Sequence, residues 1–197
     1  MIFRNIENDN DESVYGVEVS KQGASCSIRW SYPFKCTQIC IFEVPFDATF
    51  NEADAAAGKY RMHRVKYPGD NVTSTGMCNF AIFAVDDAGT LIRQRKTVYL
   101  CPINVTYSME EDRKVTVVKK GLFRKEEQVT ITNYLNVCSD ISVAGRKILY
   151  KVKDGAHMED KTFCLPVNLT AGKAQRLKLP NPIELFAVDE NITIYKS

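Results

Sequence analysis

Hydrophobic residues in this chain recur mostly with the two-residue period of β-strands. Residues 80–85 are apolar on both faces and run into the turn Asp86-Asp-Ala-Gly89, which is typical of a central strand buried in a sandwich. In residues 25–31 the apolar side chains alternate with polar ones, and the alternation places Trp30 on the inward face. Because no stretch keeps a helical period, the pattern predicts an all-β fold.

Further strands are predicted in each half of the chain. The first half shows strand patterns at residues 15–23, 25–33, 35–46, 59–67, 80–89 and 90–100, and a short helix or wide loop at 51–58. The second half shows them at residues 115–118, 128–134, 148–152, 162–169, 175–179, 183–191 and 192–195. Many short strands closed by turn signals are typical of β-sandwiches.

A repeated motif indicates that the sandwich occurs twice. The sequence Phe83-Ala-Val-Asp86 returns as Phe186-Ala-Val-Asp189, 103 residues later. We therefore expect a polar lead-in at residues 1–13, a first sandwich at 14–101 and a second at 102–197. The residues expected to form the core of these sandwiches are Trp30, Phe80, Ile82, Val85 and Phe186.

Two motifs of the first half resemble the fibronectin type III family. They are the stretch Ser27-Ile-Arg-Trp30-Ser-Tyr-Pro33 and the stretch from Phe80 to Gly89. Phe80 stands where the family usually has the tyrosine whose hydroxyl binds the preceding corner, so packing alone must hold this corner. The second half resembles only immunoglobulin-like sandwiches, through its last strands. The resemblance implies two tandem immunoglobulin-like sandwiches, a binding or spacer role and no catalytic residues to carry over.

The resemblance also draws attention to two cysteines. Cys26 and Cys78 lie early in the second and sixth expected strands, where immunoglobulin domains place their inter-sheet disulfide. The pair is expected either to form that disulfide or to pack as two thiols. With an odd total of seven cysteines and no framework spacing, reduced thiols fit a cytoplasmic protein if Met1 is the native start. Secretion remains open if a signal peptide was removed, and four Asn-X-Thr sequons agree with it.

Charge and hydropathy exclude some classes of partner. The net charge is +2, which gives no reason to expect a nucleic acid partner. No apolar run approaches the roughly 20 residues of a membrane helix, so no membrane insertion is expected.

Catalytic and metal-binding groups are sparse. The only histidines, His63 and His157, lie in an edge-strand pattern and in a polar turn, and each is interpreted as a surface residue. Cys36 and Cys40 would stand about 13 Å apart on a strand, too far to share a metal ion. The carboxylate pair Asp86 and Asp87 is interpreted as turn-forming rather than calcium-binding. We expect no enzyme activity, no cofactor and no metal.

The predicted function is therefore protein–protein interaction or scaffolding, with an unidentified protein partner. The expected binding site is a basic hairpin with an apolar tip, made of Lys119, Lys120, Leu122, Phe123, Arg124 and Lys125. The alternative is an extracellular carbohydrate-associated spacer or glycan-binding module. A glycan would stack on exposed aromatic side chains, for which the candidates are Tyr60, Tyr67, Tyr99 and Tyr107.

Overall fold

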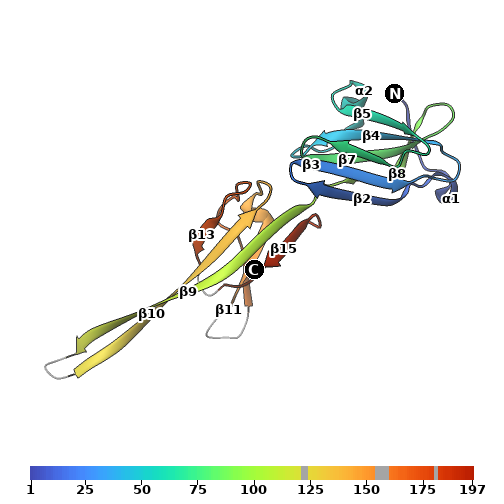
Figure 1. Ribbon diagram of the computed structural model, residues 1–197. Coiled ribbons are helices and arrows are strands. Elements are labelled where there is room, and N and C mark those ends of the chain that lie inside the picture. The colour runs from blue at the N-terminus through green and yellow to red at the C-terminus, as the bar shows by residue number, and fades with distance from the viewer. Residues whose placement is uncertain (121–123, 154–159, 180–181) are drawn as a thin grey trace. The chain divides into compact units, whose positions relative to one another are not determined.

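A computed structural model describes residues 1–120, 124–153, 160–179 and 182–197 of this chain. The fold is all-β, with only two short α-helices and a single 3-10 turn in the described part (Figure 1). The chain divides into two compact units, Met1–Pro102 and Ile103–Ser197. Within the described residues, no helix has the length and apolar character needed to cross a membrane.

Unit 1 contains two sheets with the strand orders β1-β8-β7-β4-β5 and β2-β3-β6. All strand pairs are antiparallel except β1 with β8. The elements are β1 (Phe3–Asn5), α1 (Asp9–Glu12), β2 (Tyr15–Gln22), β3 (Ser25–Ser31), β4 (Gln38–Pro45), α2 (Glu52–Ala56), β5 (Arg61–Lys66), β6 (Asn71–Ser74), β7 (Cys78–Val85) and β8 (Leu91–Tyr99).

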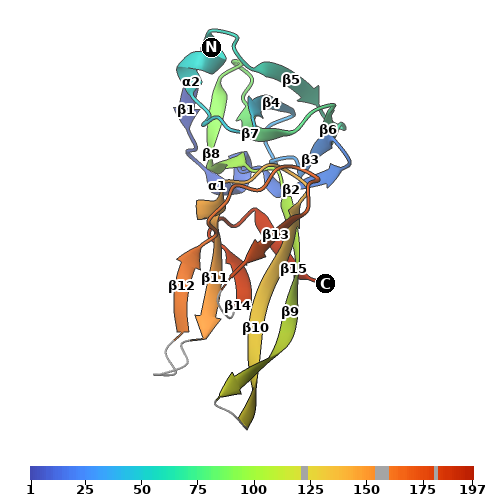
Figure 2. The ribbon, with the colours of Figure 1, turned by 90° about the vertical axis from the view of Figure 1, so that its left-hand side faces the viewer.

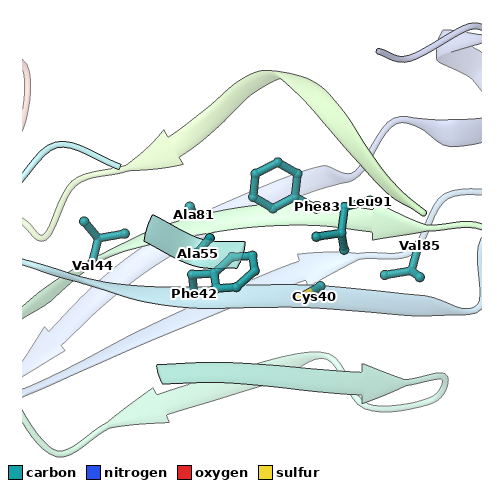
Figure 3. Packing of buried hydrophobic residues seen from close by; sticks show 8 residues of the cluster. All are labelled: Cys40, Phe42, Val44, Ala55, Ala81, Phe83, Val85 and Leu91. Atoms are coloured by element: carbon teal, nitrogen blue, oxygen red, sulfur yellow. The ribbon is translucent and has the colours of Figure 1, made fainter. Parts of the chain in front are cut away.

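The core of unit 1 forms around β7, whose residues are all buried. On one face of β7, Phe83 packs edge-on against Phe42 with ring centroids 5.8 Å apart, and Ala55 of α2 lies beside them (Figure 3). Trp30, Phe80, Ile82 and Val85, which the pattern placed in the core, are all buried. A strand with apolar residues on both faces is thus covered on both sides.

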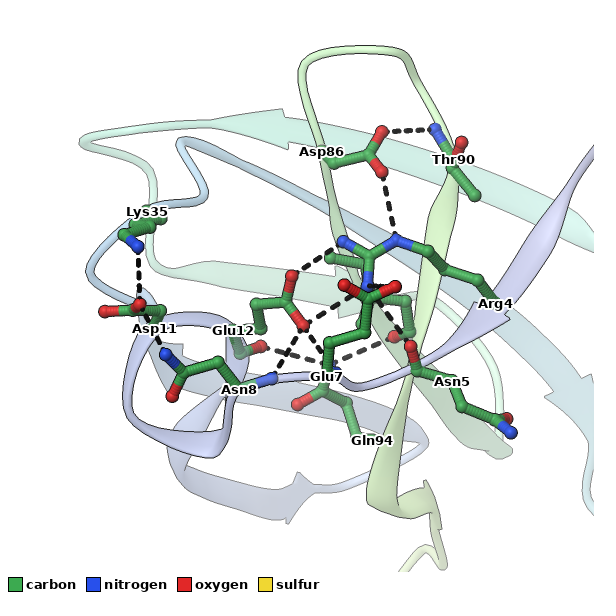
Figure 4. A network of polar contacts seen from close by, with 11 residues as sticks. Arg4, Asn5, Glu7, Asn8, Asp11, Glu12, Lys35, Asp86, Thr90 and Gln94 are labelled. Atoms are coloured by element: carbon green, nitrogen blue, oxygen red, sulfur yellow. Dashed lines mark hydrogen bonds and ion pairs between the residues drawn. The ribbon is translucent and has the colours of Figure 1, made fainter.

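The first residues of the chain differ from the expected polar lead-in, because they pack onto unit 1. Phe3 on β1 lies edge-on against Phe83 at 5.3 Å. The Arg4 guanidinium donates to Glu12 at 2.7 Å and to Asp86 at 3.2 Å, so it joins β1, α1 and the turn after β7 (Figure 4). The pairing of β1 with β8, the Phe3 ring, the Arg4 guanidinium and ion pairs such as Lys35 with Asp11 together make this polar stretch part of the domain.

Unit 2 also contains two sheets, with the strand orders β13-β10-β9-β15 and β12-β11-β14 (Figure 2). The elements are β9 (Ile103–Lys120), β10 (Arg124–Ser139), the 3-10 turn Gly145–Lys147, β11 (Ile148–Lys153), β12 (Asp160–Cys164), β13 (Gln175–Lys178), β14 (Pro182–Ala187) and β15 (Ile192–Lys196).

The strands of the two units correspond in chain order. The sheet β2-β3-β6 matches β9-β10-β13, and β5-β4-β7 matches β12-β11-β14. The last strands differ, because β8 pairs with β7 whereas β15 pairs in parallel with β9. As a result β14 is an edge strand. Phe186, expected in the core, is only half-buried, whereas its neighbour Leu185 is buried.

Candidate interaction surface

The longest feature of unit 2 is a two-stranded arm formed by the outer parts of β9 and β10 (Figure 1). The two strands pair without a register shift from Ser139 opposite Val105 to Arg124 opposite Lys120. Other strands pair only with the inner ends, since β15 contacts residues 103–107 of β9 and β13 contacts residues 134–137 of β10. Residues 108–120 and 124–133 therefore form the arm.

One face of the arm continues the core face of unit 2. Residues with odd numbers share this face on both strands, because cross-strand partners point to the same side of a sheet. At the inner end these residues are buried, and they include Val105, Tyr107, Leu135 and Val137.

Further out, beyond the polar pair Glu111 and Asn133, the same face carries exposed aliphatic residues next to Arg113 and Glu127. Val115 lies opposite Val129, and Arg113 lies opposite Ile131. The exposed aliphatic residues of this apolar band are Val115 (52% exposed), Val117 (55%), Val129 (41%) and Ile131 (53%). The opposite face of the arm carries mainly Thr, Lys, Gln and acidic residues. A contiguous aliphatic strip beyond the domain core is typical of a surface that another molecule covers.

Charged residues are unevenly distributed along β9. Glu110, Glu111 and Asp112 form an exposed acidic segment near the inner end. Glu110 also accepts a hydrogen bond from Arg176 of β13 at 3.2 Å. The outer end of β9 is basic in sequence, ending in Lys119 and Lys120. In sequence, β9 is thus acidic near its inner end and basic at its outer end.

The sequence-predicted binding residues lie at the tip of this arm. Lys119 and Lys120 end β9, and Arg124 and Lys125 begin β10. Lys125 is exposed and is the register partner of Lys119. The predicted apolar pair, Leu122 and Phe123, lies outside the described residues. The apolar band further down the arm was not predicted as part of the site, although residues 115–118 and 128–134 were both predicted as strands.

His63 has polar neighbours, but their geometry does not suit nucleophilic catalysis. Its Nε2 atom lies 2.7 Å from Oε1 of Glu43, and the Ser74 hydroxyl donates to the other carboxylate oxygen at 3.0 Å. A catalytic triad needs the histidine between the hydroxyl and the carboxylate. Here the carboxylate lies between them, so the histidine cannot take the serine proton directly. His157 lies outside the described residues.

The three cysteines near one another in unit 1 are free thiols. Cys26 and Cys101 hydrogen-bond to each other, which lowers the pKa of Cys26. Cys78, the disulfide partner that the resemblance suggests for Cys26, donates its backbone N–H to the Cys26 sulfur, while its own thiol interacts with Ser74 and burial raises the pKa of that thiol to about 11. Burial likewise raises the pKa of Cys40 to about 12. The structure thus shows packed thiols at the expected disulfide position.

The remaining candidate groups have structural roles. Asp86 accepts from Arg4 and, at 2.8 Å, from the backbone N–H of Thr90, so its carboxylate closes the turn. No group of three or more His, Cys, Asp or Glu side chains in the described ranges is arranged to hold a metal ion.

The four tyrosines proposed for glycan stacking do not form one platform. Tyr107 is buried in unit 2, whereas the other three belong to unit 1. Tyr60 stacks on Phe50 at 5.5 Å, and Tyr99 lies under Lys96. Of the four, only Tyr67 is largely exposed, and its ring edge packs against Tyr32.

Comparison with known proteins adds no relative on which to base a role: no protein-family model matches the chain, and no curated protein matches it.

Proposed function

We propose that this protein is a non-enzymatic protein-binding module of two tandem immunoglobulin-like domains, and that the arm of unit 2 carries its binding surface. The observation on which this proposal depends is the apolar band of Val115, Val117, Val129 and Ile131, which continues the core face of unit 2 into solvent. Exposing such side chains disfavours solubility, so a role in binding explains their position.

The strand order supports the immunoglobulin-like part of the proposal. In unit 1 the first, second and fifth strands after β1 form one sheet, and the third, fourth, sixth and seventh form the other. This is the arrangement of fibronectin type III domains, in which Trp30 would lie on the second strand. The same order of the first six strands in unit 2, with the Phe-Ala-Val-Asp motif at the end of β7 and of β14, supports a tandem repeat.

The test is a capture experiment with matched bait proteins. The wild-type chain, Val117→Lys and Val188→Lys are immobilised, and proteins bound from a lysate of the native organism are quantified by mass spectrometry. Val188 is a suitable control because it is also an exposed valine of unit 2 (58%), but it lies after β14 and outside the arm.

The expected result is that one or more proteins bind to the wild type and to Val188→Lys but are lost with Val117→Lys. Circular dichroism melts should show that all three baits are equally folded. Equal capture by the three baits would mean that the arm is not the binding surface.

A further inference from the structure

We infer that the arm pairs with the arm of a second copy of this chain, through the outer edges of two antiparallel β9 strands related by a two-fold axis at Val115. This inference rests on the proposed function, because it names the partner of the same surface. It is argued from the free edge of β9, from the order of its charges and from its apolar residues.

The edge of β9 is available over a defined length. The strand β15 occupies this edge from Ile103 to Tyr107, and the backbone N–H of Ser197 donates to Tyr107 O as the last contact. Beyond that point, the described residues place no strand on this edge as far as Lys120. An unpaired strand edge is a template for another strand. The midpoint of residues 108–120 is Lys114, one residue from Val115.

In this antiparallel register, acidic residues of one β9 strand lie opposite basic residues of the β9 strand of the second copy. A two-fold axis at Val115 places Glu111 opposite Lys119 of the second copy, and Glu110 opposite Lys120. The symmetry repeats each pair, so four opposite-charge pairs form. Opposite charges directly across a sheet stabilise the pairing, and like charges destabilise it.

Neighbouring registers lack this match. An axis at Lys114 would place Lys114 opposite its own copy, and an axis at Thr116 would place Arg113 opposite Lys119. In registers whose axis passes between two residues, odd-numbered residues of one strand would lie opposite even-numbered residues of the other. Such registers would place the apolar face of one strand beside the polar face of the other. Of these registers, the one centred on Val115 satisfies both the charges and the faces, and it brings no charged residue opposite its own copy.

The same register gives the apolar band a neighbour. Val115 meets Val115 of the second copy, and Val117 meets Arg113, whose aliphatic stem can lie along the valine. The apolar bands of the two copies then form one strip across a four-stranded sheet.

The outer edge of β10 offers no such charge match. In registers with the axis at Gln128 or Val129, the charged residues Lys125, Glu126 and Glu127 would face Thr, Asn or aliphatic residues of the second copy.

The test is sedimentation equilibrium of the full-length chain over a concentration series, with variants that swap charges across the predicted register. Glu111→Lys and Lys119→Glu should each raise the dimer dissociation constant about tenfold. The double variant Glu111→Lys/Lys119→Glu should restore it. The Lys119→Glu result is discriminating, because in the backbone register of the hairpin it exchanges a Lys–Lys pair, residues 119 and 125, for a Glu–Lys pair, which favours the hairpin itself.

A second pair of variants checks the position of the axis. Val117→Lys should weaken the dimer, because Val117 faces Arg113 of the second copy, whereas Val117→Glu should strengthen it. Nonspecific apolar association would be weakened by both. Val129→Lys, on the same face but on strand β10, should have little effect on edge-to-edge pairing. If the copies instead associated by packing their apolar faces against each other, Val129→Lys would weaken the dimer as much as Val117→Lys.

The outcomes separate this inference from the proposed function. A chain that stays monomeric at every concentration, or a dimer that ignores the charge swaps, overturns the inference. If the monomeric chain still captures another protein through Val117, the proposed function stands without it. If neither self-association nor capture responds to the arm variants, both are wrong.

Discussion

Trp30 shows how one residue anchors a sheet of this protein. It lies on β3 with only 4% of its surface exposed, and its ring packs edge-on against Tyr32 at 6.3 Å. The alternation of residues 25–31 placed it inward from sequence alone, because the strand has one polar face. The repeat of the Phe-Ala-Val-Asp motif placed Phe186 in the core, whereas in the structure Leu185 is buried and Phe186 is half-buried. Alternation identifies two faces, but it cannot say which face a neighbouring sheet covers.

We predict that Trp30→Ala lowers the free energy of unfolding by about 3–5 kcal/mol, because removing a large buried side chain leaves a cavity. Urea denaturation followed by circular dichroism measures this loss, since the variant has no tryptophan fluorescence. Trp30→Phe, which keeps an aromatic ring, should cost less. A nearly neutral Trp30→Ala would mean that β3 does not anchor the core.

At the level of elements, Arg4 is one of several residues that hold β1 and α1 to the rest of unit 1. Arg4 hydrogen-bonds to Glu12, and this bond is the main reason why the pKa of Glu12 is lowered to about 2. The backbone N–H groups of Glu7 and Asn8 also donate to the Glu12 carboxylate, at 2.8 and 3.3 Å. The folded state thus favours the ionised carboxylate.

This clamp should make folding sensitive to acid. Because the pKa of Glu12 is lower in the folded state than its ordinary value of 4.5, its contribution is fully present above about pH 5 and is lost as the pH falls toward 2. Glu12→Gln should therefore be less stable than the wild type at pH 7, with the two melting temperatures converging near pH 2. Thermal melts from pH 7 to pH 2 measure the difference.

Glu7→Gln is the matched control for the acid experiment. Glu7 is mostly exposed, and its carboxylate lies 3.9 Å from the Arg4 guanidinium. Because solvent screens this ion pair, it contributes little to the stability of the fold. Melting curves for Glu12→Gln that stay parallel to the wild type at all pH values would contradict the role of the clamp.

The elements that the sequence failed to predict share a physical cause. β1 and α1 are polar stretches whose strand and helix form through distant partners such as Asp86 and Phe83. β6 has only four residues. The outer part of β9 begins with charged residues at 110–114, so its pattern was recognised only at 115–118. The hydrophobic period of a sequence arises because one face of an element is buried. Strands that extend into solvent, or that are held by a few contacts, therefore show only a weak period.

On the scale of the whole molecule, each unit has its own core and its own sheets. The boundary falls after Pro102, and the preceding residue, Cys101, is fully buried in unit 1 and donates its backbone N–H to Asn79 at 3.0 Å. Asn79 in turn donates to the carbonyl of Phe46. Residue 101 therefore belongs to unit 1 by its hydrogen bonds as well as by its burial.

We predict that fragments of residues 1–102 and 103–197 fold separately, because each contains a complete core. Circular dichroism melts should show a cooperative transition for each fragment. A fragment of residues 1–99 should melt at a lower temperature than 1–102, since it leaves the buried Asn79 amide without one of its partners. Unfolded fragments would show that the two units depend on each other.

The long hairpin of unit 2 also sets an order of events during folding. β9 pairs with β10 across a short connection, whereas its other neighbour, β15, is the last strand of the unit. Hairpins close in about 1–10 µs, while contacts between distant segments must first overcome loop-closure entropy. The hairpin of β9 and β10 can thus form before β15 pairs with β9. During that interval the edge of β9 that does not pair with β10 is open along its whole length, so the segment from Ile103 to Tyr107 can also pair with other chains until β15 covers it.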